Sequence, residues 1–208
     1  MHFHIEHNRG HHRRMATPED PATARRGETV YAFMVRSVVF GWLSAWSIEA
    51  HRLRGKGLKA HIVHNQMLHF QLIQLSAVAA VAVLLGATVA AAWVTSAVVG
   101  FLLLEVVNYV EHYGLVREKL PNGKYERVSP RHSWNSDHPI SRALLFELPR
   151  HADHHAYPAR PYGSLRHFAE AHQLPTGYPG MVLLALFPPV FFRVMDRQLE
   201  AEHQRLAA

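Results

Sequence analysis

The distribution of charged and apolar positions divides the chain into a polar start, a charge-free centre and a polar second half. Residues 70–104 contain no Asp, Glu, Lys or Arg, and the nearly uncharged stretch 70–110 is about 41 residues long. As a helix this stretch would measure roughly 60 Å, about twice the thickness of a bilayer core. The pattern therefore predicts a transmembrane hairpin over residues 67–113, with its turn between Gly86 and Trp93. The alternative is one long buried helix of a soluble protein, which a charge-free stretch of this length disfavours.

The residues before the hairpin predict one further long helix. Residues 30–53 carry an apolar face, two tryptophans and scattered arginines. This combination suits a helix that lies at the membrane surface or packs on the bundle. Residues 16–29 contain two prolines and a glycine and predict a loop, whereas the His- and Arg-rich residues 1–14 are compatible with a helix.

The pattern after the hairpin is more broken. Residues 117–139 are polar, contain a P-N-G-K turn and are compatible with a short β-ribbon. Residues 140–156 predict a helix that ends in histidines. Residues 179–196 are apolar, but Pro188 interrupts them, so they predict a docked or partly inserted helix rather than a clean span. Together the elements predict an all-α integral membrane helical bundle, formed as a single domain over residues 1–208.

Composition narrows the chemistry and the partners. The chain has no cysteine, which excludes disulfides, Cys-ligated zinc and iron–sulfur clusters. It has 18 histidines, and histidine is the commonest metal ligand. Its 22 Lys+Arg exceed its 16 Asp+Glu, and basic residues flank the hairpin on both sides. The positive-inside rule places both flanks in the cytoplasm, and we expect anionic lipid or an acidic protein, rather than nucleic acid, to meet this charge.

Two histidine arrays stand near the ends of the polar regions. His7, His11 and His12 form H-x-x-x-H-H, and "RHADHHA" forms H-x-x-H-H with its own three histidines. On an α-helix His7 and His11 would share a face, with His12 about 100° away from His11. The second array occupies one helix face and consists of His151, His154 and His155. Two such arrays in one chain predict a joint metal site.

A third element lies at the end of the hairpin, in "EVVNYVEHYG". Glu105, Asn108 and His112 are at i, i+3 and i+7, on one face of the second predicted membrane helix. Ionisable residues at such positions are functional candidates, although these could also face lipid headgroups. Nitrogen ligands without sulfur suit Fe, Zn, Cu or Ni, and the number of histidines favours two ions over one. The sequence contains neither H-E-x-x-H nor G-x-S-x-G, which disfavours a zinc protease and a serine hydrolase.

Segments along essentially the whole chain resemble the membrane-bound non-haem di-iron alkane 1-monooxygenases, the AlkB-type alkane hydroxylases of the fatty acid desaturase-like superfamily. "EHNRGHH" with "ATPEDPA" resembles the second histidine box of that family, and "NYVEHYG" resembles the HYG motif that distinguishes it from desaturases. "PRHSWNSDH", "LPRHADHHA", "SLRHF" and "QLPTGYPGMVLLAL" resemble its last box and C-terminal pattern.

The resemblance implies a cytoplasmic di-iron site in a multi-pass protein of the bacterial inner membrane. The enzyme would use O2 and electrons from rubredoxin to hydroxylate the terminal methyl of a medium- or long-chain alkane. No catalytic side chain is expected beyond the metal ligands. The implied iron ligands are His7, His11, His12, His112, His151, His154 and His155. Candidates for orienting these rings are Glu6, Glu105, Asn108, Glu111, Asp137, His138 and Asp153.

One feature of the resembled family is missing, because the sequence contains no H-E-x-x-x-H first box. We therefore expect the chain to be the C-terminal portion of such an enzyme, truncated and inactive alone. A related membrane di-iron enzyme of the xylene monooxygenase or desaturase type is an alternative, although "NYVEHYG" speaks against a desaturase. A membrane metal-binding fragment without enzyme activity is the other alternative.

Overall fold

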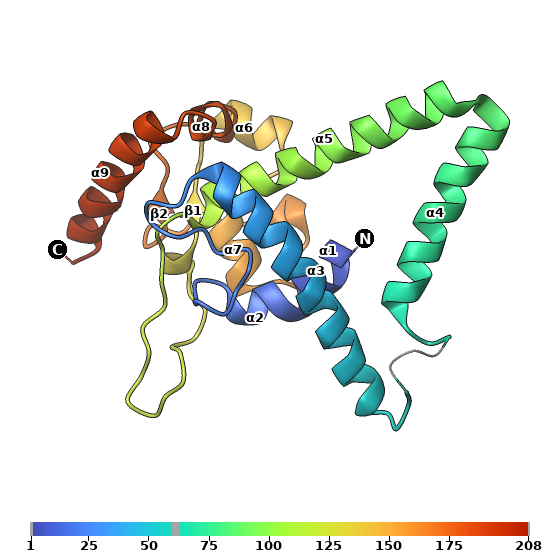
Figure 1. The fold of residues 1–208 in the computed structure, drawn as a ribbon. Coiled ribbons are helices and arrows are strands. Elements are labelled where there is room, and N and C mark those ends of the chain that lie inside the picture. Colours follow the sequence, from blue (N-terminus) through green and yellow to red (C-terminus); the bar gives the residue numbers. More distant parts are fainter. Residues whose placement is uncertain (1, 60–62, 208) are drawn as a thin grey trace.

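The hairpin dominates the shape of the molecule (Figure 1). The computed structural model describes residues 2–59 and 63–207. Helix α4 (Gln66–Leu85) and helix α5 (Ala87–His112) are joined only by Gly86, whose φ of 88° suits glycine. The turn is therefore much shorter than the predicted segment from Gly86 to Trp93. The described helices confirm the expected all-α membrane fold, since three of them are long and apolar enough to cross a membrane.

Helix α3 (Val30–Arg54) is the third of these helices and the least apolar, with a mean hydropathy of 1.2 against 2.0 for α4 and α5. Thr29 directly precedes it, and the Thr29 side chain accepts a hydrogen bond from the Ala32 amide and so caps the helix. Whereas the first turn of α4 packs on α3 and α1 through Met67 and Phe70, most of α4 and the outer part of α5 extend away from the other elements (Figure 1). Their leucines and valines are largely exposed, as expected of surfaces that face lipid or other apolar helices.

The remaining elements gather around the inner end of α5 (Figure 1). In chain order they are α1 (His2–Glu6), the π-helix η1 (His7–His11), α2 (His12–Arg14), η2 (Pro130–His132), β1 (Trp134–Asn135), α6 (Pro139–Leu144), α7 (His151–Ala156), η3 (Tyr162–Ser164), β2 (His172–Gln173), α8 (Tyr178–Ala185) and α9 (Pro188–Ala207).

An aromatic core fixes the inner end of α5. Tyr109, Tyr113, Trp134 and Phe191 are fully buried and pack together with residues of α3 and α8. The Trp134 indole donates a hydrogen bond of 2.8 Å to the Tyr113 carbonyl, directly after α5 ends. This packing holds the last turn of α5, and with it His112, in one position.

The structure differs from the pattern-based expectations at three places after the hairpin. The expected ribbon in residues 117–139 shrinks to one antiparallel bridge between Lys119 and Tyr125 with flanking backbone hydrogen bonds, and Trp134–Asn135 joins a separate pair of strands. The predicted helix 140–156 is two helices, because Phe146 and Glu147 between them adopt positive φ angles. The stretch 179–196 is interrupted at Pro188 as expected, but it forms two helices rather than one docked helix. Helix α8 ends at Ala185 and Pro188 begins α9, since proline lacks only an amide that the first helical residue leaves unbonded anyway.

The parallel pair of β1 and β2 was not predicted. Trp134 pairs with His172 and Asn135 with Gln173. Each strand has two residues, too few to leave an alternating pattern in the sequence. The Asn135 side chain accepts a hydrogen bond of 2.8 Å from the Ala152 amide. The small sheet thus fastens the first turn of α7 and positions its histidines.

Candidate metal centre

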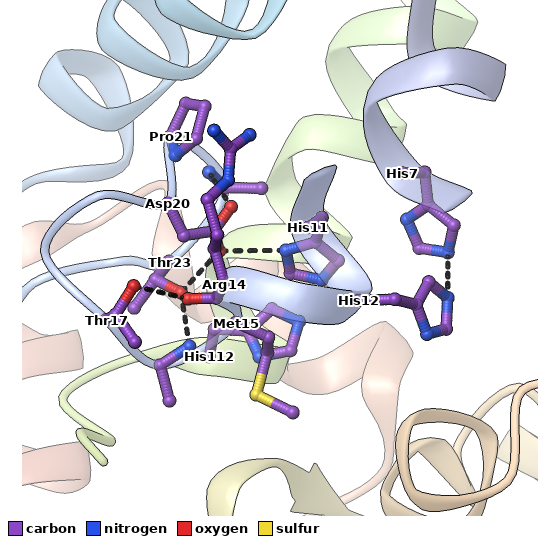
Figure 2. A network of polar contacts seen from close by, with 12 residues as sticks. His7, His11, His12, Arg14, Met15, Thr17, Asp20, Pro21, Thr23 and His112 are labelled. Atoms are coloured by element: carbon purple, nitrogen blue, oxygen red, sulfur yellow. Dashed lines mark hydrogen bonds and ion pairs between the residues drawn. The ribbon is translucent and has the colours of Figure 1, made fainter. Parts of the chain in front are cut away.

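The first histidine array lies on a π-helix rather than an α-helix. In η1 the His12 amide donates to the His7 carbonyl, an i→i+5 bond that widens the turn by one residue. The wider turn places His12 beside His7, with 3.1 Å between their Nε2 atoms (Figure 2). The rings of His7 and His11 still stack, with 5.2 Å between their centroids, but the extra residue in the turn lets the Nε2 atom of His12 rather than that of His11 meet His7.

Four buried histidines form the first group. His11, His112, His151 and His155 each offer a ring nitrogen, and these nitrogens all lie within 4.8 Å of one another. The Nε2 atom of His151 is 3.3 Å from that of His112 and 2.8 Å from that of His155. Two nitrogens bound to one ion at about 2.1 Å lie at most roughly 4.2 Å apart, so small ring rotations would suit a metal.

Three half-buried histidines form the second group. His7, His12 and His154 offer nitrogens within 4.8 Å of one another, and the Nε2 atoms of His7 and His154 are 3.2 Å apart. The two groups adjoin, because the ring centroids of His12 and His155 are 4.6 Å apart. The structure thus brings together all seven histidines that the sequence singled out.

Each array contributes to both groups. In α7, His151 and His155 stand at i and i+4 and belong to the first group, whereas His154 belongs to the second. The first array divides the other way: His11 belongs to the first group, whereas His7 and His12 belong to the second. The two arrays thus each supply ring nitrogens to both adjoining groups.

Burial keeps most of these histidines neutral, as metal ligation requires. Burial lowers the pKa of His12 to about 3, with the neighbouring His154 and His11 adding to the effect. Burial and surrounding histidines also lower the pKa values of His7, His151 and His155. The Nε2 atom of His11 is buried without a partner among the described residues, which fits an atom that awaits a metal ion.

Asp20 orients His11, and the sequence analysis did not select it. One Asp20 carboxylate oxygen lies 2.8 Å from His11 Nδ1 and accepts a hydrogen bond from its N–H, which leaves Nε2 free to face the group (Figure 2). Burial alone would lower the pKa of His11, but the Asp20 carboxylate outweighs burial and raises it. Thr23 donates to the same carboxylate at 2.6 Å. The sequence signal that could have identified Asp20 is "ATPEDPA", which follows the histidines directly. An acidic residue in such a turn-rich loop can fold back onto the histidines before it.

The predicted orienting residues divide into several cases. Glu111 lies 3.3 Å from His151 Nδ1 and is the one that contacts a histidine of the groups directly. Glu6 instead pairs with Arg14 and the Ser44 hydroxyl. Asp153 pairs with Arg160 and Arg166 and fastens α7 to the following loop.

The other candidates lie at the surface or keep a buried polar atom without a hydrogen bond among the described residues. Asp137 pairs with Arg150 and His167 on the surface side, and His138 is exposed. Glu105 and Asn108 are buried on α5 beside the groups, and each retains an unpaired polar atom. Within residues 2–59 and 63–207, Asp137, His138 and Asp153 form no hydrogen bond or ion pair with a histidine of the two groups.

Comparison with known proteins identifies relatives over nearly the whole chain. The Fatty acid desaturase family matches residues 1–185. The chain is 46% identical over 198 residues to the alkane 1-monooxygenase of Acinetobacter baylyi, which covers 95% of this chain and 48% of that protein. It is 46% identical to alkane 1-monooxygenase 1 of Alcanivorax borkumensis, covering 97% and 50% of the two chains. It is 31% identical to the xylene/toluene monooxygenase hydroxylase component XylM of Pseudomonas putida, covering 93% and 51%. The chain spans about half the length of the curated relatives it matches.

Proposed function

Since the chain belongs to the fatty acid desaturase family, we propose that its seven clustered histidines hold two non-haem irons in an alkane 1-monooxygenase. The observation that carries the proposal is the division of both arrays between two adjoining all-nitrogen groups. Alkane hydroxylation is favoured over the oxidation of xylene, because the similarity is 46% to the alkane enzymes and 31% to the xylene enzyme.

The surroundings of the proposed enzyme follow from the same reasoning. The protein lies in the bacterial inner membrane with its histidines on the cytoplasmic side, where basic flanks meet anionic lipid. A linear alkane enters from the lipid, and O2 is the second substrate. Rubredoxin, a small acidic electron carrier, delivers the electrons to the basic cytoplasmic face.

The bound irons would supply the reduction of O2 and the oxidation of the terminal C–H bond. The chain itself holds and orients the ligands: Asp20 keeps the His11 proton on Nδ1, and Glu111 stands beside Nδ1 of His151. The aromatic core behind His112 keeps bulk water from that side of the centre. The net reaction joins alkane, O2, two electrons and two protons to give the alkanol and water.

The test is metal content and alkane conversion in whole cells. The chain would be expressed alone, and also joined to the part of the Acinetobacter baylyi relative that it does not match. Rubredoxin and its reductase would be co-expressed. We expect the joined form to bind two irons per chain and to convert a medium-chain alkane into the 1-alkanol, and the chain alone to convert none.

Matched variants assign the ligands. His155→Ala should abolish conversion and lower the iron content, because His155 belongs to the four-histidine group. His167→Ala is the control, since His167 is half exposed and pairs with Asp137 outside the groups. An iron-loaded joined form that oxidises xylene but no alkane would favour the XylM-type reaction. Iron binding without any oxygen consumption would favour a non-enzymatic metal-binding protein.

A further inference from the structure

The π-turn that carries the first histidine array needs a local cause. Single π-turns are rare, and they occur frequently at functional sites. In η1 the His12 amide donates to the His7 carbonyl, whereas in an α-helix it would donate to the Asn8 carbonyl. The contacts that hold η1 in this form therefore decide where the rings of His7 and His12 lie.

One ion pair spans the turn from end to end. Glu6 directly precedes η1 and is 5% exposed, and Arg14 ends the short helix α2 that follows η1. Arg14 Nη2 donates to Glu6 Oε1 and, at 2.7 Å, to the Ser44 hydroxyl. The Ser44 hydroxyl donates in turn to Glu6 Oε1 at 3.1 Å. The three side chains thus form a triangle whose third corner lies on α3.

Gly10 lies directly beneath this ion pair. A methyl group on Gly10 would come within 3 Å of both Glu6 Oε1 and Arg14 Nη2. The φ angle of Gly10 is not in the left-handed region, so its backbone conformation does not require glycine. Glycine weakens a helix relative to alanine, so its presence here needs another reason. Space for the ion pair is that reason.

A second contact fastens η1 to the same long helix. Arg9 Nη1 donates to Gln66 Oε1 at 3.1 Å and to Glu49 Oε2 at 3.5 Å. Glu49 is fully buried on α3, and Arg52 holds it through hydrogen bonds of 2.7 and 2.6 Å. Since Ser44 and Glu49 both belong to α3, this helix supports η1 at two points. The support comes from residues outside the histidine groups, so it does not depend on a bound metal.

We propose that the side chains of Glu6, Arg14 and Ser44 form a clamp over η1. The clamp keeps this segment a π-turn and so positions His7 and His12 for the metal ion of the second group. The inference rests on the proposed function, because it assumes one ion in each histidine group. The three residues are positioning residues, since they act on the ligands and touch no substrate.

The clamp matters more for the second group than for the first. Without it, η1 would relax to α-helical hydrogen bonding, and the Nε2 atoms of His7 and His12 would separate from their 3.1 Å. In the first group Asp20 holds His11, and the other three histidines come from α5 and α7. Breaking the clamp should therefore raise the dissociation constant of the second group's ion about 10–100-fold, the usual range for residues that orient metal ligands. The ion of the first group should stay bound.

Gly10→Ala tests the clamp with a single methyl group. The joined form is titrated with Fe(II) in the absence of oxygen, in competition with a chelator, and the two dissociation constants are compared. We expect the 10–100-fold weakening at one of the two sites. Gly100→Ala is the matched control, since Gly100 is exposed on α5 and an added methyl group would contact no described side chain within 4 Å. Unchanged affinity for both ions in Gly10→Ala would overturn the proposal.

Variants of Arg14 separate positioning from packing. Arg14→Ala should weaken the same ion as Gly10→Ala does. Because its short side chain leaves room for the methyl group, the two substitutions together should weaken that ion no more than Arg14→Ala alone. Arg14→Lys keeps a charged donor and should retain most of the affinity. Additive losses in the double variant, or equal loss of both ions in Arg14→Ala, would refute the clamp.

An experimental density map of Arg14→Ala in the joined form gives a readout that does not depend on activity. We expect the His12 amide to donate to the Asn8 carbonyl in this variant. Persistence of its bond to the His7 carbonyl would show that the clamp does not hold the π-turn. If the unsubstituted joined form binds fewer than two irons or hydroxylates no alkane, the proposed function fails, and this backbone bond still decides the role of the clamp.

Discussion

At the scale of single residues, Asp20 has the clearest effect on the metal centre. It is buried, accepts a hydrogen bond of 2.8 Å from His11 Nδ1 and accepts another from the Thr23 hydroxyl. Loss of a carboxylate that orients a metal-bound histidine typically lowers metal affinity about 10–100-fold. Asp20→Ala should therefore weaken iron binding by that factor, measured by competition with a chelator. Glu19→Ala, an exposed carboxylate next to it, should change nothing; equal loss in both variants would contradict the assigned role.

The ion pair of Glu28 and Arg36 gives a pH prediction. Arg36 Nε and Nη2 donate to the two carboxylate oxygens of Glu28 at 2.7 Å each. Burial alone would raise the pKa of Glu28, but these contacts outweigh it and lower the pKa below its ordinary 4.5. The folded-state pKa is thus below the unfolded one, so the pair stabilises the protein fully above about pH 4.5 and loses this contribution as pH falls through the folded-state pKa.

Glu28→Gln should accordingly lower the free energy of unfolding by about 1 kcal/mol at neutral pH and make its decline in acid shallower. Thermal unfolding in detergent at a series of pH values measures both effects. Glu170→Gln, at an exposed position, is the reference variant. If the free energy of unfolding of Glu28→Gln declined in acid as steeply as that of the unsubstituted protein, the pair would not contribute to stability.

At the scale of elements, the π-helix η1 decides how the first array divides. Its extra residue lets His7 and His12 serve one group while His11 serves the other. Removing one residue from a single π-turn restores α-helical spacing. Deletion of exposed Asn8 should therefore turn His7 away from His12 and lower the metal content from two ions to one per chain.

Metal analysis of the purified variant measures this change. Asn8→Ala is the matched control, because it keeps the chain length and removes only the exposed contacts of Asn8 to His4. Two ions in the deletion variant would show that the π-turn is not needed for the second position.

At the scale of the whole molecule, the histidine cluster constrains the topology. His7, His11 and His12 precede α3, whereas His112 ends α5 and the second array follows it. Three membrane crossings between them would put the two sets on opposite sides, yet the structure brings them together. We infer that only α4 and α5 cross, as a hairpin, and that α3 lies along the membrane surface. The lower hydropathy of α3 agrees with this inference.

Cysteine labelling tests the topology, since the chain has no cysteine of its own. In intact cells Thr88→Cys, at the start of α5, should react with an impermeant thiol reagent. Lys56→Cys after α3 and Asn122→Cys in the polar loop should react only after the cells are opened. Labelling of Lys56→Cys from outside would show that α3 crosses the membrane.

The sequence predicted much of the fold and most of the candidate site, for reasons that are local. A long charge-free stretch leaves few options besides a membrane hairpin, and α4 and α5 match the predicted span within a residue at each end. Histidines three to five residues apart are neighbours on any helical turn, so their grouping was visible before the fold. The short strands and the break between α6 and α7 could not be predicted from the sequence, because they depend on contacts between distant residues.

The sequence by itself thus determined the membrane hairpin, the all-nitrogen donor set and the family, because each depends on residue type and spacing along one helix. Tertiary structure decided which histidines share a position and that Asp20 orients His11. These relations arise where η1, α5 and α7 meet, and no spacing along the chain encodes them. The π-turn shows the difference most directly: its additional residue brings the Nε2 atom of His12, rather than that of His11, next to the Nε2 atom of His7.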